Sequence, residues 1–308
     1  LTSENLRQLG TNLQLRFRER DWFGLNWRDF GISASAVHLY NEQFESSVFG
    51  FPSFFDTHVE NLYFRLQYML IRGTSREISE GFAALSNTEG GLQEIRGQGA
   101  QALVDLALGP TVWTLEFNYA SGDPNPRSTM PITSFSFARD MNVGLLLFEH
   151  VMAFESARSV AVGIENLSGV ETESFPLTEV RTEGRFTNAL AFFPQLTIDL
   201  FERPEHNIHT RMGVLFAWAA TAGGVVDPIM TSINDTGADI SESAVNFHGG
   251  RPGRYYGTEF DLQLGYRFRE NFYWVLEGAM LLPGDGLHDE HGLAVRSFLV
   301  ENRFEFQF

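Results

Sequence analysis

The last stretch of the chain, Ala294–Phe308, alternates between two kinds of side chain. One row is mostly apolar and consists of Phe298, Val300, Asn302, Phe304, Phe306 and Phe308. The other row is mostly polar and consists of Leu299, Glu301, Arg303, Glu305 and Gln307. This period-2 pattern predicts a β-strand with one apolar and one polar face. The apolar face would pack on a second layer in a soluble protein, whereas in a membrane barrel it would meet lipid.

The same alternation recurs along the chain and predicts about ten strands, with two to four more in stretches that have no clear period. The predicted strands cover residues 13–18, 32–40, 62–71, 102–108, 113–119, 195–200, 210–218, 259–268, 272–280 and 294–308. Residues 21–30 are predicted to form a loop. Residues 41–60 fit either a long turn or a short strand pair.

The predicted connections differ in length at the two ends of the strands. Short turns follow Leu108, Phe201 and Phe268, and Gly109-Pro110 is typical of a tight turn. Long loops follow Tyr119, Trp218 and Leu282. Short turns at one end and long loops at the other are the arrangement of outer-membrane barrels, with the C-terminus expected on the periplasmic side.

Residues 122–186 form the longest irregular stretch, within what we predict to be a single domain over residues 1–308. Between Val143 and Val160, Leu147, Val151, Phe154 and Arg158 recur near helical spacing, which predicts an amphipathic helix. In a barrel, such a segment would constrict or plug the lumen, or cover its mouth.

Alternation alone fits a soluble β-sandwich or a lipocalin-like barrel as well as a membrane barrel. Three features favour the membrane. Aromatic residues gather near strand ends, the polar rows mix small residues with charges of both signs, and most strands are long for a sandwich. We therefore predict an all-β fold, a transmembrane antiparallel up-and-down β-barrel of about 10–14 strands with one helix-containing loop.

If the strand phases hold, charged residues line the lumen and set its selectivity. They are Arg16, Arg18, Arg65, Asp105, Glu116, Asp199, Arg211, Glu259, Asp261, Arg267, Glu277, Glu301, Arg303 and Glu305. The alternative is that these charges pair across neighbouring strands and plug a narrow barrel.

Little in the sequence points to catalysis or to a cofactor. Nucleotide-binding and hydrolase motifs are absent, and no Ser–His spacing singles out a pair, so we predict that the chain is not an enzyme and needs no cofactor. The acidic loop with Asp285, Asp289 and Glu290 is a weak candidate for a divalent cation, and a solvated loop without a metal is the favoured interpretation. There are no cysteines, and the net charge of −17 argues against nucleic acid as a partner.

The terminal aromatic strand, with Phe304, Phe306 and Phe308, resembles the C-terminal assembly signal of bacterial outer-membrane proteins. Residues 257–261, 282–285 and 119–125 resemble segments of alginate-export-type porins, whose members have larger barrels, and this length also fits part of such a barrel. The resemblance implies contact with the lipid bilayer and lipopolysaccharide, and recognition by the barrel-assembly machinery.

These patterns predict a bacterial outer-membrane porin or export channel for polar solutes, with passive passage along the rows of Arg and carboxylate side chains. The alternative is a plugged barrel that anchors envelope protein partners.

Overall fold

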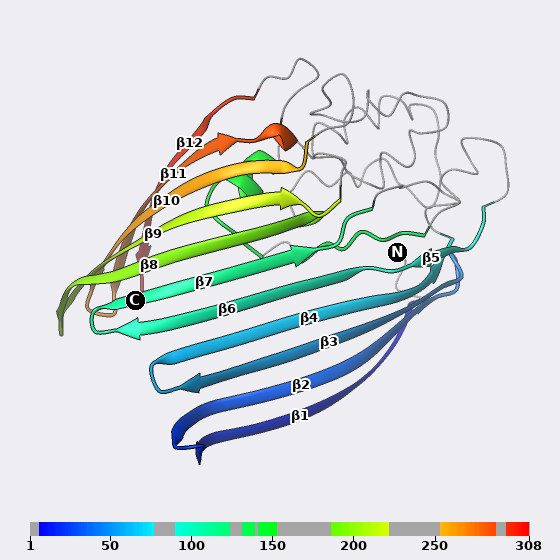
Figure 1. Ribbon diagram of the computed structural model, residues 1–308, viewed down its shortest axis with the longest axis horizontal. Coiled ribbons are helices and arrows are strands. Elements are labelled where there is room, and N and C mark those ends of the chain that lie inside the picture. The colour runs from blue at the N-terminus through cyan, green and yellow to red at the C-terminus, as the bar shows by residue number, and fades with distance from the viewer. Residues whose placement is uncertain are drawn as a thin grey trace.

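The computed structural model describes residues 6–76, 90–123, 131–138, 141–152, 186–221, 253–287 and 294–307. Strands dominate these residues and follow one another in chain order (Figure 1). The strands are β1 (Leu6–Trp22), β2 (Leu25–Asn41), β3 (Ser46–Val59), β4 (Leu62–Ser75), β5 (Gln93–Ile95), β6 (Gln98–Leu108), β7 (Thr111–Ala120), β8 (Ala189–Arg203), β9 (His206–Ala219), β10 (Tyr255–Phe268), β11 (Phe272–Pro283) and β12 (Ser297–Phe306).

All of these strands belong to one antiparallel sheet. Its path is β1-β2-β3-β4-β6-β7-β8-β9-β10-β11-β12, and the short β5 pairs with β4 off this path. The all-β, antiparallel up-and-down fold is therefore confirmed. Closure into a barrel is not seen in the described residues, because β1 and β12 form the two ends of the path and do not pair with each other.

The connections follow the predicted asymmetry. At one end, which we call the turn end, the strands are joined through residues 23–24, 60–61, 109–110, 204–205 and 269–271. The opposite end, the loop end, carries the long connections between β4 and β6, β7 and β8, β9 and β10, and β11 and β12. The short link at 42–45, between β2 and β3, also lies there.

Two sequence predictions near the N-terminus are wrong. Residues 21–30 are not a loop but the β1–β2 hairpin, whose turn consists of Phe23 and Gly24, both at positive φ. Asp29, also at positive φ, falls at a register shift of the β2–β3 ladder, and this irregularity breaks the alternation that a strand would show. Residues 46–59 form the long strand β3, in which the ladder to β2 skips Pro52, a residue that cannot donate a backbone hydrogen bond.

Helical structure is sparse in the described residues. A π-helix, η1, covers Leu147–Val151, and a 3-10 helix, η3, covers Asp285–Leu287. The predicted helix at 143–160 is thus helical over part of its described portion, and residues 153–160 lie outside the described part. Within the described residues, no helix is both long and apolar enough to cross a membrane.

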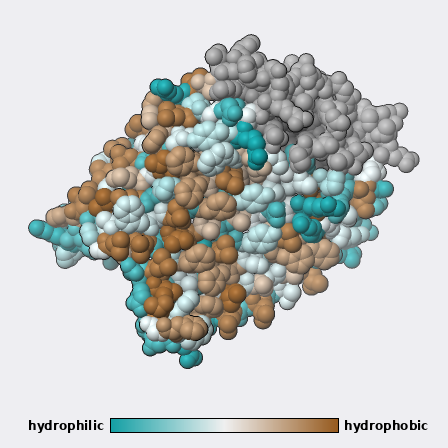
Figure 2. All heavy atoms as spheres, viewed as in Figure 1, coloured by the Kyte–Doolittle hydropathy of each residue, from teal (hydrophilic) through white to brown (hydrophobic). Residues whose placement is uncertain are grey.

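The two faces of the sheet differ in composition. One face, here called the outer face, carries rows of apolar side chains that continue across paired strands, for example Met212, Leu262, Gly278 and Val300. Many of these side chains are exposed, including Leu13 (79%), Leu262 (56%) and Val300 (80%). Figure 2 shows hydrophobic residues gathered over the strands, with hydrophilic residues at the turn tips. The opposite, inner face carries the polar rows and the buried core.

Candidate functional site

The pairing register places the predicted lumen residues together on the inner face. One row of partners runs Arg16, Gly31, Asp56, Arg65, Leu103 and Glu116 from β1 to β7. A second runs Thr197, Arg211, Gln263, Glu277 and Glu301 from β8 to β12. Other ladders add Asp105 opposite Thr114, Asp261 opposite Gly213, Arg303 opposite Val275 and Glu305 opposite Tyr273.

The remaining predicted residues follow the same alternation. Arg18 lies two residues beyond Arg16 in β1, Asp199 pairs with His209, and Arg267 pairs with Tyr273. Glu259 pairs with Leu215 and Leu281 at the loop-end side of the inner face. The predicted strand phases therefore agree with the register, while the role of these residues in a pore stays a prediction.

The charges on the inner face are mostly not neutralised by each other. Within the described residues, the ion pairs are His58–Asp29, Arg76–Glu45, Arg96–Glu94 and Arg269–Glu205, and none of them includes a predicted lumen arginine. Arg65 instead donates from Nε to the hydroxyl of Tyr63 at 2.8 Å. Charged side chains that have no ion-pair partner produce an electrostatic field that acts on mobile ions.

Neutral amides hold several inner-face carboxylates. Glu116 accepts hydrogen bonds from the side-chain amides of Gln101, Asn118 and Gln195, which lie on β6, β7 and β8. Glu277 accepts one from Gln263, and Asp105 accepts one from the Thr114 hydroxyl. These bonds fix the orientation of the carboxylates without removing their charge.

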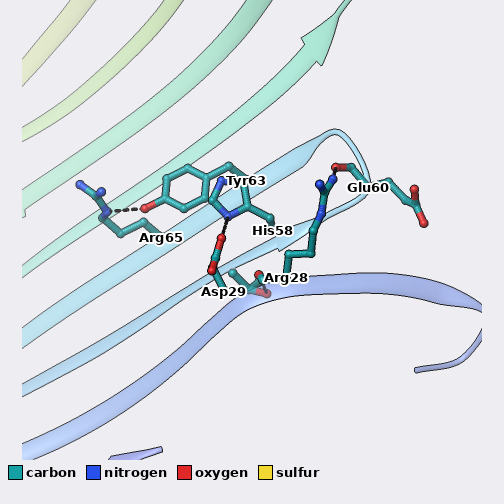
Figure 3. Close-up of polar contacts among 7 residues, drawn as sticks. Arg28, Asp29, His58, Glu60, Tyr63 and Arg65 are labelled. Atoms are coloured by element: carbon teal, nitrogen blue, oxygen red, sulfur yellow. Dashed lines mark hydrogen bonds and ion pairs between the residues drawn. The ribbon is translucent and has the colours of Figure 1, made fainter. Parts of the chain in front are cut away.

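Sequence reasoning missed a polar cluster at the turn end of β2, β3 and β4. Figure 3 shows His58 facing Asp29, with Nδ1 3.8 Å from Oδ2, and Arg28 donating to the backbone oxygen of Glu60 at 3.0 Å. The rings of His58 and Tyr63 lie 4.5 Å apart. The signal was hidden because β3 and the start of β2 were not recognised as strands.

The inner face near the loop end is covered by residues 131–138 and 141–152, here called the inner segment. The segment packs on a row of small residues. Gly99, Ala120, Ala189 and Ala219 are successive partners across β6 to β9. Phe135 packs so closely on Gly99 that a Cβ there would clash with its ring. The alternating alanines in β8 and β9 were the sequence signal for this packing site.

A cluster of aromatic residues continues the contact. The ring of Phe186 lies 4.7 Å from that of Phe148 and 5.7 Å from that of Phe137, and Phe137 lies 4.9 Å from Phe135. Leu147, Val143 and Phe186 are fully or almost fully buried in this core. The buried apolar core of the described residues thus lies on the inner face, beneath the segment.

Glu259, on β10, binds the backbone of residues 145–147 and so holds this part of the chain on the sheet. Its side chain is fully buried and accepts three hydrogen bonds from successive backbone N–H groups. Oε1 accepts from Leu145 at 2.7 Å and from Leu146 at 2.9 Å, and Oε2 accepts from Leu147 at 2.6 Å. These are donors at the start of a helical turn, which a carboxylate stabilises through hydrogen bonding and through the helix dipole.

Gly144 makes this contact possible. Its φ is +74°, and a Cβ at this position would lie 2.7 Å from Glu259 Oε1 and 2.8 Å from Leu215 Cδ2. The turn therefore needs a residue without a side chain for both conformational and steric reasons. Sequence reasoning placed Glu259 in the lumen but did not identify its partner, because the two residues lie far apart in the chain.

Farther from this segment, the inner face is open at the turn end. A cavity of about 600 Å³ is lined there by Asn207, His209, Arg267, Tyr273 and Glu305, among others. Its walls combine both signs of charge with neutral hydrogen-bonding groups. Arg267 and Glu305 are two of the predicted lumen residues.

Of the three predicted metal candidates, Asp285 alone lies within the described residues. Asp285 accepts a hydrogen bond from the backbone N–H of Tyr255 at 3.0 Å, which ties η3 to the start of β10. Asp289 and Glu290 lie outside the described residues, as does Phe308 of the terminal signal. The described part contains no group of three or more His, Asp or Glu side chains suited to a metal ion.

Comparison with known proteins gives structural likeness at very low sequence identity. The NanC porin is 8% identical with a TM-score of 0.34, and the match covers 99% of this chain and 98% of that one. A variant of OccD1 (OprD) is 10% identical with a TM-score of 0.39, covering 94% of this chain and 67% of that one. The β domain of the Bordetella autotransporter BrkA is 8% identical with a TM-score of 0.26, covering 98% and 92%.

No family model matches the sequence, and no curated protein matches it. At these identities and TM-scores, the structural likenesses identify neither a solute nor a partner. The resemblance to alginate-export-type porins stays a prediction.

Proposed function

We propose that the chain forms an outer-membrane channel through which polar solutes pass passively along the inner face, narrowed by residues 131–152. The main observation behind this proposal is that the two faces of the sheet carry opposite kinds of side chain. Exposed apolar rows cover the outer face, and charges without ion-pair partners among the described residues line the inner face.

The outer face supports membrane residence. Contiguous exposed apolar surface beyond a few hundred Å² is uncommon on soluble monomers and marks a site of contact with protein or membrane. Aromatic rings also gather at the turn end, where Phe17, Trp22 and Phe30 contact one another on β1 and β2, and Phe272 contacts Phe304 and Phe306 across β11 and β12. Such a band is typical of the membrane interface.

This location implies an orientation and a set of partners, which are part of the proposal. The turn end, with the end of β12, would face the periplasm, and the loop end would face outward. The outer rows would contact the bilayer and lipopolysaccharide, and the terminal aromatic strand would be read by the barrel-assembly machinery. No step in this function uses a catalytic group or a cofactor.

The second candidate is the plugged anchor, and one observation favours it. Apolar side chains of residues 135–137 and 141–152 pack against the inner face over β7 to β11, which reduces the space available for a passage. Against this, a sealed barrel would not need the turn-end cavity or the inner arginines that have no ion-pair partner among the described residues. Reconstitution into liposomes distinguishes the two candidates, since a sealed barrel that co-purifies with protein partners gives no current.

Ion selectivity tests the channel directly. We expect Arg211→Ala and Arg303→Ala to shift the reversal potential in a salt gradient toward greater cation selectivity, because each removes a cation from the inner face. Arg76→Ala is the matched control, since Arg76 pairs with Glu45 at the loop end, away from the inner rows. Unchanged selectivity in both inner-face variants would contradict the assignment of this face as the lumen.

A further inference from the structure

The turn-end cavity carries one cation and one carboxylate on a single row of paired residues. The row crosses β9, β10, β11 and β12 and consists of Asn207, Arg267, Tyr273 and Glu305. All four line the cavity, whose volume of about 600 Å³ falls in the range of small-molecule sites. Because neighbouring strands lie about 4.8 Å apart, the backbones at Arg267 and Glu305 are separated by about 10 Å, with Tyr273 between them.

The two charged groups are available to a ligand. Among the described residues, the guanidinium of Arg267 makes no hydrogen bond and no ion pair. Glu305 uses one oxygen, since Gln307 donates from Nε2 to Oε1 at 3.2 Å, and Oε2 is left for another donor. The wall that carries Glu305 is held in place, because the backbone N–H of Gln307 donates to the Asn271 oxygen at 3.0 Å and Asn271 Nδ2 donates back to the Gln307 oxygen at 3.1 Å.

Neutral groups between the charges bind one another. His209 Nδ1 lies 3.2 Å from Asn207 Oδ1, and His209 Nε2 lies 3.4 Å from the Tyr273 hydroxyl. Since an amide oxygen only accepts, Nδ1 carries the proton, and in the neutral ring Nε2 accepts from Tyr273. The imidazole lies so close over Gly265 that a Cβ there would clash with it. These groups form a fixed floor that separates the two charges and neutralises neither.

This arrangement distinguishes between classes of solute. An anion drawn to Arg267 is repelled by Glu305, and a cation drawn to Glu305 is repelled by Arg267. A neutral solute displaces water from both charges and supplies no opposite charge to either. A molecule with a carboxylate at one end and an ammonium group at the other satisfies both, and the guanidinium can bind its carboxylate with two parallel hydrogen bonds.

We propose that the turn-end cavity binds small zwitterions of the amino-acid or short-peptide type, with the carboxylate at Arg267 and the ammonium group at Glu305. The inference rests on the proposed function, because it names a class of polar solute for the channel and places a binding site for it at the turn end.

Three probes of nearly the same size test the need for both charges. Glycylglycine carries both, N-acetylglycylglycine carries the carboxylate alone, and glycylglycinamide carries the ammonium group alone. Calorimetry on the folded full-length chain in detergent should show glycylglycine binding about tenfold or more tightly than either analogue, because each analogue loses one charge-assisted hydrogen bond. Equal affinity for either analogue, or no binding of glycylglycine, would overturn the proposal.

Substitutions locate the two ends of the ligand. We expect Arg267→Gln and Glu305→Gln each to weaken glycylglycine binding about tenfold or more. Arg269→Gln is the matched control, since Arg269 pairs with Glu205 in the turns and is not among the described residues that line the cavity. A loss confined to Glu270→Gln, the other carboxylate of the lining, would contradict the placement of the ammonium group.

An exchange of the two charges separates ligand binding from a structural role. With Arg267→Glu and Glu305→Arg combined, the dipeptide can bind in the reverse orientation, and we expect most of the affinity that the single variants lose to return. Heat-modifiable migration on a gel checks that each variant is folded. A folded double variant that binds no better than the single variants would contradict the proposed pairing.

The two levels of the account fail in different ways, because calorimetry does not require conduction. Selective binding of glycylglycine without any current in liposomes would reject the channel and leave the binding site. Current in liposomes without any preference for glycylglycine over its analogues in calorimetry would reject the binding site and leave the channel.

Discussion

At the scale of single residues, the contact between Gly144 and Glu259 holds residues 144–147 on the sheet. A buried carboxylate is costly unless its charge is compensated by several hydrogen bonds. Glu259 obtains three of them from one turn of backbone, and Gly144 leaves room for the approach. The pair therefore links strand β10 to the segment that packs on the inner face.

We predict that Gly144→Ala destabilises the protein more than Gly109→Ala. Both glycines have positive φ, so each substitution incurs a conformational cost of about 1–2 kcal/mol. Only at Gly144 would the new Cβ collide with Glu259 and Leu215, whereas Gly109 has open space around it. Urea unfolding in lipid vesicles measures the unfolding free energies of the two variants. Equal losses would show that the space beside Gly144 can accommodate a Cβ without cost.

Many of these side-chain contacts could not be predicted from the sequence. The inner position of Glu259 followed from its place in the alternation of β10. Its use as an anchor did not, because the three N–H groups that it binds are separated from it by more than 110 residues. Arg28 and His58 were missed for a local reason, since the irregular backbone at Asp29 hides the strand that carries Arg28.

At the scale of elements, the long regular strands were predictable and the irregular ones were not. Residues 62–71 and 259–268 alternate without interruption and form β4 and β10. By contrast, β3 contains Gly50 and Pro52, which interrupt the pattern although the sheet continues on both sides. Packing of a whole strand between two neighbours overrides such local signals.

Loss of the anchor should release the segment from the sheet. We expect Glu259→Ala to remove three hydrogen bonds to a charged group and to cost about 3 kcal/mol or more, since bonds to charged groups contribute about 1.5–3 kcal/mol each. Single-channel conductance should rise as the inner face opens. Glu116→Ala is the matched control, because Glu116 binds three side-chain amides within the sheet. If the two variants conduct alike, the segment is not the constriction.

At the scale of the whole molecule, the proposed channel requires lipid at the outer face of the sheet and water at the inner face. The sheet places adjacent residues of β10 in different surroundings, with Leu262 on the outer face and Gln263 on the inner face beside Glu277. In a water-soluble protein, the exposed position of Leu262 would tolerate a charged side chain. In a bilayer, the same position near the middle of the strand would not.

The most direct measurement compares the unfolding free energies of Leu262→Arg and Gln263→Arg in lipid vesicles. We predict that Leu262→Arg lowers the unfolding free energy by about 2–4 kcal/mol, the cost of an arginine near the bilayer midplane. We expect Gln263→Arg to lower it little, because the new guanidinium can donate to Glu277 in the polar interior. Equal costs, or a larger loss for Gln263→Arg, would contradict the assignment of the outer face to lipid and the inner face to the lumen.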